Sequence, residues 1–179
     1  MWALCEFSRE ITMGAFNPWK AEGGFDPSGL VKGWAAEVGA QMLVEAGAKN
    51  VLINASGDIV LRGGKPAGGP WSIGITSPHD VEKYVKFFDV TDGSVATSGD
   101  YEKGAHIVDP HTGLIAIGAR SATVIGPDGA ICDALATALM VDGVDAQKWI
   151  GRAELADYSF WTINRHDGTA WSYGSNKGY

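Results

Sequence analysis

The sequence NVLINASGDIVLR, residues 50–62, marks where the hydrophobic pattern of this chain changes to a period of two. Alternating apolar residues on either side of Ser56-Gly57 predict strands at 51–55 and 59–62, because successive side chains of a strand point to opposite faces. Asp92-Gly93 and Asp167-Gly168 each separate two apolar runs and suit tight turns, which predicts two hairpins. The other expected strands cover residues 71–76, 85–91, 94–97, 105–108, 121–125, 160–164 and 170–173.

Helical periodicity flanks this region on both sides. Apolar residues at three- and four-residue steps predict helices that end at Met13-Gly14 and that run over about 29–46 and 130–141, with a shorter one near 147–151. Ser28 is the expected N-cap of the long helix. Its expected apolar face carries Val31, Trp34, Ala35, Val38 and Met42. We therefore expect the α+β class, with a largely antiparallel sheet covered by helices, in a single domain over residues 1–179.

Composition narrows the classes of partner. The 179 residues carry 14 Lys and Arg against 21 Asp and Glu, a net charge of −7, and form no basic run, so we expect no nucleic-acid partner. Cys5 and Cys132 lack CxxC spacing and neighbouring histidines, and we expect both to be buried hydrophobes. The chain has no apolar stretch of about 20 residues, and Met1 to Glu10 have neither the basic start nor the apolar middle of a signal peptide. This predicts no membrane-spanning segment and, by default, a cytoplasmic location.

Four short segments place small and polar residues where strands end or helices begin. They are DPSGLVKG at 26–33, NASGD at 54–58, ATSGDYE at 96–102 and HIVDPHTG at 106–113. Glycine lets a ligand approach the backbone closely, and free N–H groups at a helix N-terminus favour phosphate. Each segment alone is most simply a turn, but four together predict a ligand site.

The helix sequence CDALATAL, residues 132–139, places Asp133 and Thr137 four residues apart on one face. A carboxylate and a hydroxyl are hard ligands that suit Mg²⁺, which commonly takes few protein ligands. Alternatively, Asp133 caps the helix and the Thr137 hydroxyl bonds to a backbone carbonyl. This segment by itself leaves both interpretations open.

Seven short motifs follow one another along the chain. They are GAFNPW, DPSGLVKGWAAE, NASGDI, PWSIGI, ATSGDYE, HIVDPHTG and DALATAL. This series, from about Leu4 to Leu139, resembles that of the bacterial FAD:protein FMN transferases, the ApbE-type family once labelled thiamine-biosynthesis lipoproteins. The resemblance implies an ApbE-like fold and an Mg²⁺-dependent enzyme that uses FAD as substrate. Such an enzyme attaches FMN through a phosphoester to a Thr or Ser of an acceptor protein and releases AMP.

The resemblance also implies roles for the matched residues. Asp133, Thr137 and the backbone carbonyl of Ala55 are expected to bind Mg²⁺. His106 is expected to accept the proton of the acceptor hydroxyl. Asp109 either orients His106 or bonds the flavin, although Asp-Pro followed by Thr-Gly is equally ordinary turn chemistry. The expected FAD-binding residues are Lys32, Ser98, Gly99, Asp100, Tyr101 and Thr112.

The chain departs from the family pattern in places. Ser56-Gly57-Asp58 stands where the family usually has Gly-Gly-Asp, and His111 stands where Arg is common. We expect Asp58 to anchor the turn between two strands. Family members carry further residues before the position of Met1, often with a lipoprotein signal, so we expect this chain to lack the family's N-terminal segment. Hydrolysis of FAD to FMN and AMP, and flavin binding without catalysis, are the alternative functions.

Overall fold

The fold is built on one six-stranded sheet in which every neighbouring pair of strands is antiparallel. We describe a computed structural model of residues 1–20, 23–100 and 107–174. The strands, in spatial order, are β1 (Val51–Ala55), β2 (Asp58–Arg62), β5 (Gly93–Gly99), β6 (Ala119–Gly126), β7 (Ser159–Asn164) and β8 (Ala170–Tyr173). Strands β3 (Trp71–Thr76) and β4 (Tyr84–Val90) pair separately as a two-stranded sheet.

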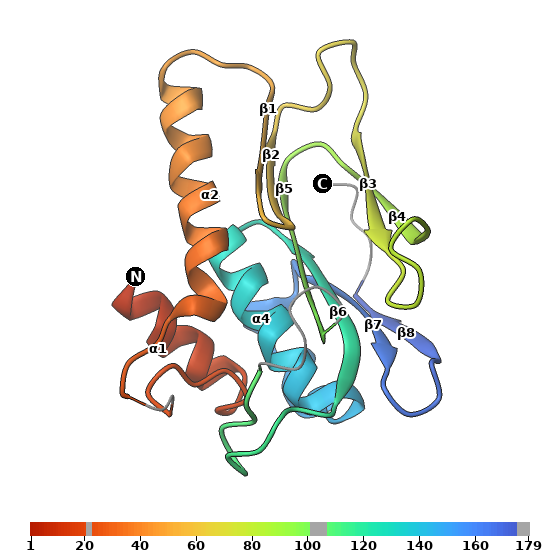
Figure 1. Cartoon of the computed structure of the whole chain (residues 1–179). Helices are drawn as coiled ribbons and strands as arrows, with labels where there is room; N and C mark the ends of the chain where they lie inside the picture. Colours follow the sequence, from red (N-terminus) through yellow and green to blue (C-terminus); the bar gives the residue numbers. More distant parts are fainter. Residues whose placement is uncertain (21–22, 101–106, 175–179) are drawn as a thin grey trace.

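Helices cover one face of the large sheet, and the small sheet packs on the other (Figure 1). The helical elements are α1 (Trp2–Ile11), α2 (Ser28–Glu45), α4 (Gly129–Asp142), η1 (Gly143–Ala146), α5 (Gln147–Ile150) and η2 (Ala153–Leu155). This arrangement confirms the predicted α+β class and the largely antiparallel sheet. An exposed loop at 65–69 joins β2 to β3 and projects from the top of the view in Figure 1.

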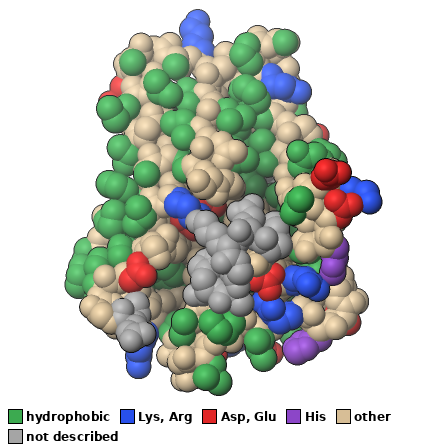
Figure 2. Space-filling model, viewed as in Figure 1, with side chains coloured by type: hydrophobic (Ala, Val, Ile, Leu, Met, Phe, Trp, Pro, Cys, Tyr) green, Lys and Arg blue, Asp and Glu red, His purple; other side chains and the backbone are tan. Residues whose placement is uncertain are grey.

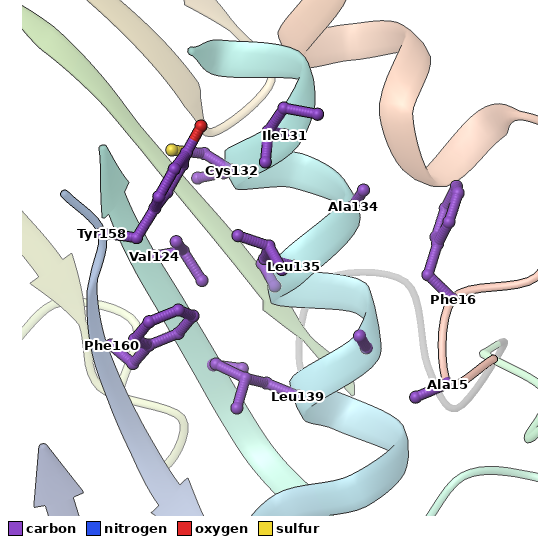
Figure 3. Packing of buried hydrophobic residues seen from close by; sticks show 14 of the residues in the cluster. Ala15, Phe16, Val124, Ile131, Cys132, Ala134, Leu135, Leu139, Tyr158 and Phe160 are labelled. Carbon is purple, nitrogen blue, oxygen red and sulfur yellow. The ribbon is translucent and has the colours of Figure 1, made fainter. Parts of the chain in front are cut away.

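The main core lies between α4 and the sheet. Leu135 and Leu139 of α4 point toward Val124 and Phe160 of the sheet, and Phe16 lies on the other side of the helix (Figure 3). The α4 sequence is apolar on nearly every side, a pattern typical of a helix buried all round. On the opposite face of the sheet, a second cluster joins it to the small sheet through Leu61, Ile73, Ile75, Phe88, Val95, Ile125 and Trp161.

Helix α2 is oriented differently from our prediction. Its buried residues are Leu30, Gly33, Ala36 and Ala40, whereas Val38 and Met42 of the predicted apolar face are 41% and 64% exposed. The small residues face inward because they let α2 approach α4 closely. Contrary to the prediction, Ser28 is not the N-cap, because it is the first residue of the helix and Pro27 occupies the N-cap position. Figure 2 shows the hydrophobic side chains that consequently gather on the α2 side of the surface.

The predicted Asp92-Gly93 hairpin is wrong. Strand β4 pairs only with β3 within the described chain, and β5 pairs with β2 and β6. The Asp92 side chain instead accepts a 2.9 Å hydrogen bond from the Gly63 N–H, so the dipeptide connects two different sheets. The Asp167-Gly168 hairpin is confirmed, because β7 and β8 pair directly. Of the strand predicted at 105–108, the described part forms only an isolated bridge between Val108 and Ile115.

Candidate functional site

A cavity of about 730 Å³ opens where the first turn of α2, the end of β5 and the middle of α4 meet. The loop that follows α1 and the segment 107–113 complete its wall. Three of the four segments predicted to form a ligand site contribute several residues each, and the fourth contributes Ser56. The lining residues include Phe16, Asn17, Asp26, Gly29, Lys32, Ser56, Thr97, Ser98, Gly99, Val108, Pro110, Asp133 and Thr137.

Glycines bring the two helices of the site together. A Cβ atom on Gly33 of α2 would lie 2.0 Å from the backbone oxygen of Gly129 at the start of α4, so only glycine fits at this crossing. One turn away, a Cβ on Gly29 would lie 2.9 Å from the Thr137 hydroxyl. The close approach also lets the Gly33 N–H donate to Asp133 Oδ2 at 3.2 Å. Lys32 and Asp133 are therefore positioned by backbone packing.

Three charged side chains meet beneath the cavity. Lys32 forms ion pairs with Asp58, at the start of β2, and with Asp133 Oδ1 at 3.5 Å. Both aspartates are almost fully buried, whereas the Lys32 side chain is 33% exposed and lines the cavity. One ammonium group thus faces two buried carboxylates, and the cluster retains a charge of about −1 when all three groups are ionised.

The pKa values of this cluster reflect burial first and pairing second. The pKa of Asp58 is raised to about 7, because burial and then the charge of Asp133 raise it by more than Lys32 lowers it. Burial also raises the pKa of Asp133, against the effects of Lys32 and the Gly33 N–H. Burial lowers the pKa of Lys32, but the two carboxylates outweigh it, so the net direction is upward and the ammonium group stays charged.

Asp133 and Thr137 fit a hard divalent cation. Both line the cavity and carry side-chain oxygen atoms, and Asp133 Oδ1 faces Lys32 rather than a backbone donor. Asp128 caps α4 by accepting from the Ile131 N–H at 3.0 Å, so the capping alternative for Asp133 is wrong. No group of three or more His, Cys, Asp or Glu side chains arranged for a metal occurs in the described residues. The Asp133 carboxylate and the Thr137 hydroxyl suit Mg²⁺, which uses few protein ligands and takes others from substrate phosphates.

The remaining predicted residues differ in where they lie. Ser98 and Gly99 line the cavity, but Asp100 forms an ion pair with Arg165 at 2.7 Å. Tyr101 and His106 lie outside the described residues. Ala55 is half-buried at the end of β1, and its neighbour Ser56 lines the cavity.

Asp109 and Thr112 belong to a turn beside the cavity. The His111 N–H donates to Asp109 Oδ1 at 2.8 Å, and the Thr112 hydroxyl donates to Oδ2 at 2.9 Å. Both carboxylate oxygens are thus engaged locally, which matches the turn interpretation of Asp109. Pro110 and Gly113 of the same turn line the cavity. The turn therefore contributes to the wall through these two residues.

Sequence reasoning gave no site role to several residues that the structure places there. Asp58 was interpreted as a turn anchor, yet its carboxylate lies with Lys32 and next to Asp133. Asn17 and Asp26 belong to quoted motifs but received no role, and both line the cavity. No local signal marked Asp58, because Asp beside Gly between two strands is ordinary turn chemistry and its partner Lys32 lies 26 positions away.

The sequence of this chain is similar to that of a known protein family. The sequence model described as the ApbE family matches residues 7–159. FAD:protein FMN transferase of Vibrio cholerae is 36% identical over 128 residues, covering 66% of this chain and 38% of that protein. The protein of the same name from Haemophilus influenzae is 33% identical over 153 residues, covering 79% and 44%. The chain therefore spans about two fifths of the length of these relatives.

Solved structures share the fold. The ApbE protein of Thermotoga maritima superposes with a TM-score of 0.82 at 24% identity, covering 95% of this chain and 73% of that one. The flavin transferase ApbE of Vibrio cholerae gives a TM-score of 0.80 at 24% identity, covering 97% and 73%.

Within residues 1–20, 23–100 and 107–174, every helix is too short or too polar to cross a membrane.

Proposed function

The chain belongs to the ApbE family, and from this membership we propose that it is an Mg²⁺-dependent FAD:protein FMN transferase. The single observation that carries the proposal is the meeting of Lys32, Asp133 and Thr137 in one cavity with Ser98 and Gly99. A volume of about 730 Å³ lies within the range of sites for small organic ligands. The relatives named FAD:protein FMN transferase support the same activity.

The proposed reaction exchanges the phosphoanhydride bond of FAD for a phosphoester bond to the acceptor. The oxygen of an acceptor Thr or Ser forms a bond to the FMN phosphorus, the bond from that phosphorus to the bridging oxygen breaks, and AMP leaves with that oxygen. Asp133 and Thr137 would hold Mg²⁺, which supplies charge neutralisation for the pyrophosphate when bound. Lys32 faces the same cavity and is placed to pair with a phosphate oxygen. Through the family resemblance, His106 takes the proton that the acceptor hydroxyl loses.

The wall of the cavity supports flavin binding as well. Phe16 and Pro18 offer apolar surface, and Ser98 and Gly99 offer a hydroxyl and backbone N–H groups at the end of β5. A flavin needs both, because its ring is largely apolar and its edge and ribityl chain are polar. The acceptor protein is proposed on the same grounds as the activity, from the names of the relatives.

The test separates transfer from hydrolysis. The protein is incubated with FAD, Mg²⁺ and candidate acceptor proteins, and the intact mass of each acceptor is measured together with released nucleotide. We expect one acceptor to gain the mass of an FMN group with one AMP released per acceptor. The same acceptor with its target Thr or Ser replaced by Ala should gain nothing. Free FMN and AMP with an unmodified acceptor would assign hydrolysis instead, and unchanged FAD would contradict both.

A further inference from the structure

The Lys32 ammonium group lies at unequal distances from two carboxylates. It pairs closely with Asp58 Oδ2, whereas its distance to Asp133 Oδ1 is 3.5 Å. Asp133 Oδ2 is already engaged by the Gly33 N–H. Oδ1 is therefore the atom of Asp133 that either Lys32 or a cation in the cavity can contact, and the two compete for it.

Asp58 is fixed more firmly than a turn residue needs to be. It is 2% exposed, it is the first residue of β2, and it is paired in register with Ala55 across the turn. Its Oδ1 atom is buried and accepts no hydrogen bond from a donor among the described residues, and its carboxyl group lies against that of Asp133. A buried carboxylate with an unpaired oxygen is costly, so the turn alone does not account for an aspartate here. Its observed ion pair is with Lys32.

The three residues come from elements that hold them independently. Asp58 is set by the β1–β2 pairing, Asp133 by α4, and Lys32 by the first turns of α2. Without Asp58, Asp133 would be the remaining partner of the half-buried Lys32 ammonium group in the cluster. A partly desolvated charge is unfavourable unless it pairs with an opposite charge. It would then move onto Oδ1 and neutralise the atom that a cation needs.

We propose that Asp58 is a positioning residue, which holds the Lys32 ammonium group on its own carboxylate and so keeps Asp133 Oδ1 available to a divalent cation. The inference rests on the proposed function in one respect, because it takes Asp133 as a ligand of that cation. Asp58 itself acts through Lys32. Partners that orient a metal ligand are commonly worth about 10- to 100-fold in metal affinity, which sets the size of the effect.

The test measures Mn²⁺ binding directly, by the electron paramagnetic resonance signal of free Mn²⁺, without any turnover. We expect Asp58→Asn to weaken Mn²⁺ binding by about 10- to 100-fold. Lys32→Met removes the competing ammonium group and should bind Mn²⁺ at least as tightly as the wild type. The double variant Asp58→Asn/Lys32→Met should recover most of the affinity that Asp58→Asn loses. Asp92→Asn, an exposed turn aspartate, is the matched control and should bind like the wild type.

The outcomes are distinguishable. Recovery in the double variant supports the proposal, because a purely structural role of Asp58 would not be repaired by removing Lys32. Equal Mn²⁺ affinity in Asp58→Asn and wild type overturns it while leaving the metal site intact. If Asp58→Asn does not fold, the folded double variant still decides by its affinity. A wild-type protein that binds no Mn²⁺ contradicts the metal part of the proposed function, and this inference with it.

Discussion

Asp133 is the side chain whose replacement tests the site most directly. We predict that Asp133→Asn lowers the proposed FMN transfer by more than about 100-fold, since the proposal makes Asp133 a ligand of the metal and not merely a partner of one. Asparagine keeps the shape and can still accept from the Gly33 N–H, which matters because Asp133 is 1% exposed. Transfer rate and circular dichroism melting should be measured together. Full activity in a folded variant would remove Asp133 from the metal site.

The thiols of the two cysteines should be unreactive in the native protein. Cys5 and Cys132 are both buried, and burial raises the pKa of each thiol. A higher pKa leaves less thiolate at neutral pH, and thiolate is the reactive form. We predict that a disulfide reagent such as DTNB labels neither thiol in the native protein at pH 7.5 and labels both in guanidinium chloride. Rapid labelling of one thiol without denaturant would show that its surroundings open.

At the residue scale, the sequence indicated which residues line the cavity better than it indicated which residues pair with them. Asp133 and Thr137 share a face of the helix because their spacing is local, and both line the cavity; their role as metal ligands stays a prediction. The pairing of Lys32 with Asp58 joins residues 26 positions apart on different elements, which no local pattern encodes. The ion pair between Asp100 and Arg165 escaped prediction for the same reason.

At the scale of elements, the crossing of α2 and α4 is the sensitive contact. We predict that Gly33→Ala destabilises the protein by about 3 kcal/mol, because its Cβ would lie 2.0 Å from a backbone oxygen that cannot rotate away. This corresponds to a fall in Tm of roughly 6–12 °C. Gly39→Ala in the same helix is the matched control, since its Cβ would meet only the flexible tip of Ile53 at 3.0 Å.

The control variant should change the free energy of unfolding by less than about 1 kcal/mol, because the gain in helix propensity offsets a small adjustment of Ile53. Thermal melts of both variants provide the comparison. Similar Tm values for Gly33→Ala and wild type would show that the two helices can separate without cost.

The bounds of several helices and strands could be predicted from the sequence, but which elements lie next to one another could not. Periodicity located β1, β3 and β8 at the predicted residues and α4 within one residue at each end. The Asp92-Gly93 dipeptide has the right chemistry for a hairpin, yet β3 competes successfully for β4. The face of α2 was mistaken because larger apolar residues usually point inward, whereas here close helix contact selects the smallest.

For the whole molecule, ligand binding should raise the thermal stability. We predict that FAD and Mg²⁺ together raise Tm by roughly 5–10 °C, the effect of a ligand present at about 100 times its dissociation constant. FAD without metal should raise Tm less, because its pyrophosphate charge faces buried carboxylates. Excess EDTA should reverse the additional increase. An increase that EDTA leaves unchanged would contradict a role for the metal in binding FAD.

The fold class of the whole molecule could be predicted from the sequence, but the arrangement of its layers could not. The alternation of strand and helix patterns indicated an antiparallel sheet covered by helices, and the ordered motifs pointed to the family. The separate sheet of β3 and β4 on the far face could not be foreseen. Its strands have the same local pattern as the others, and which strands pair is decided by packing over long sequence distances.

The loop at 65–69 lies at the end of the molecule away from the segments 15–18 and 107–113 that line the cavity (Figure 1). Its residues are exposed, and a tight turn closes it through the Gly68 N–H and the Lys65 carbonyl at 2.8 Å. With both native thiols buried, a cysteine placed at Ala67 would be a single attachment point for a sensor chip or a fluorescent dye. A protein immobilised there would keep its cavity open to the flavin and the acceptor proteins that we propose as its substrates.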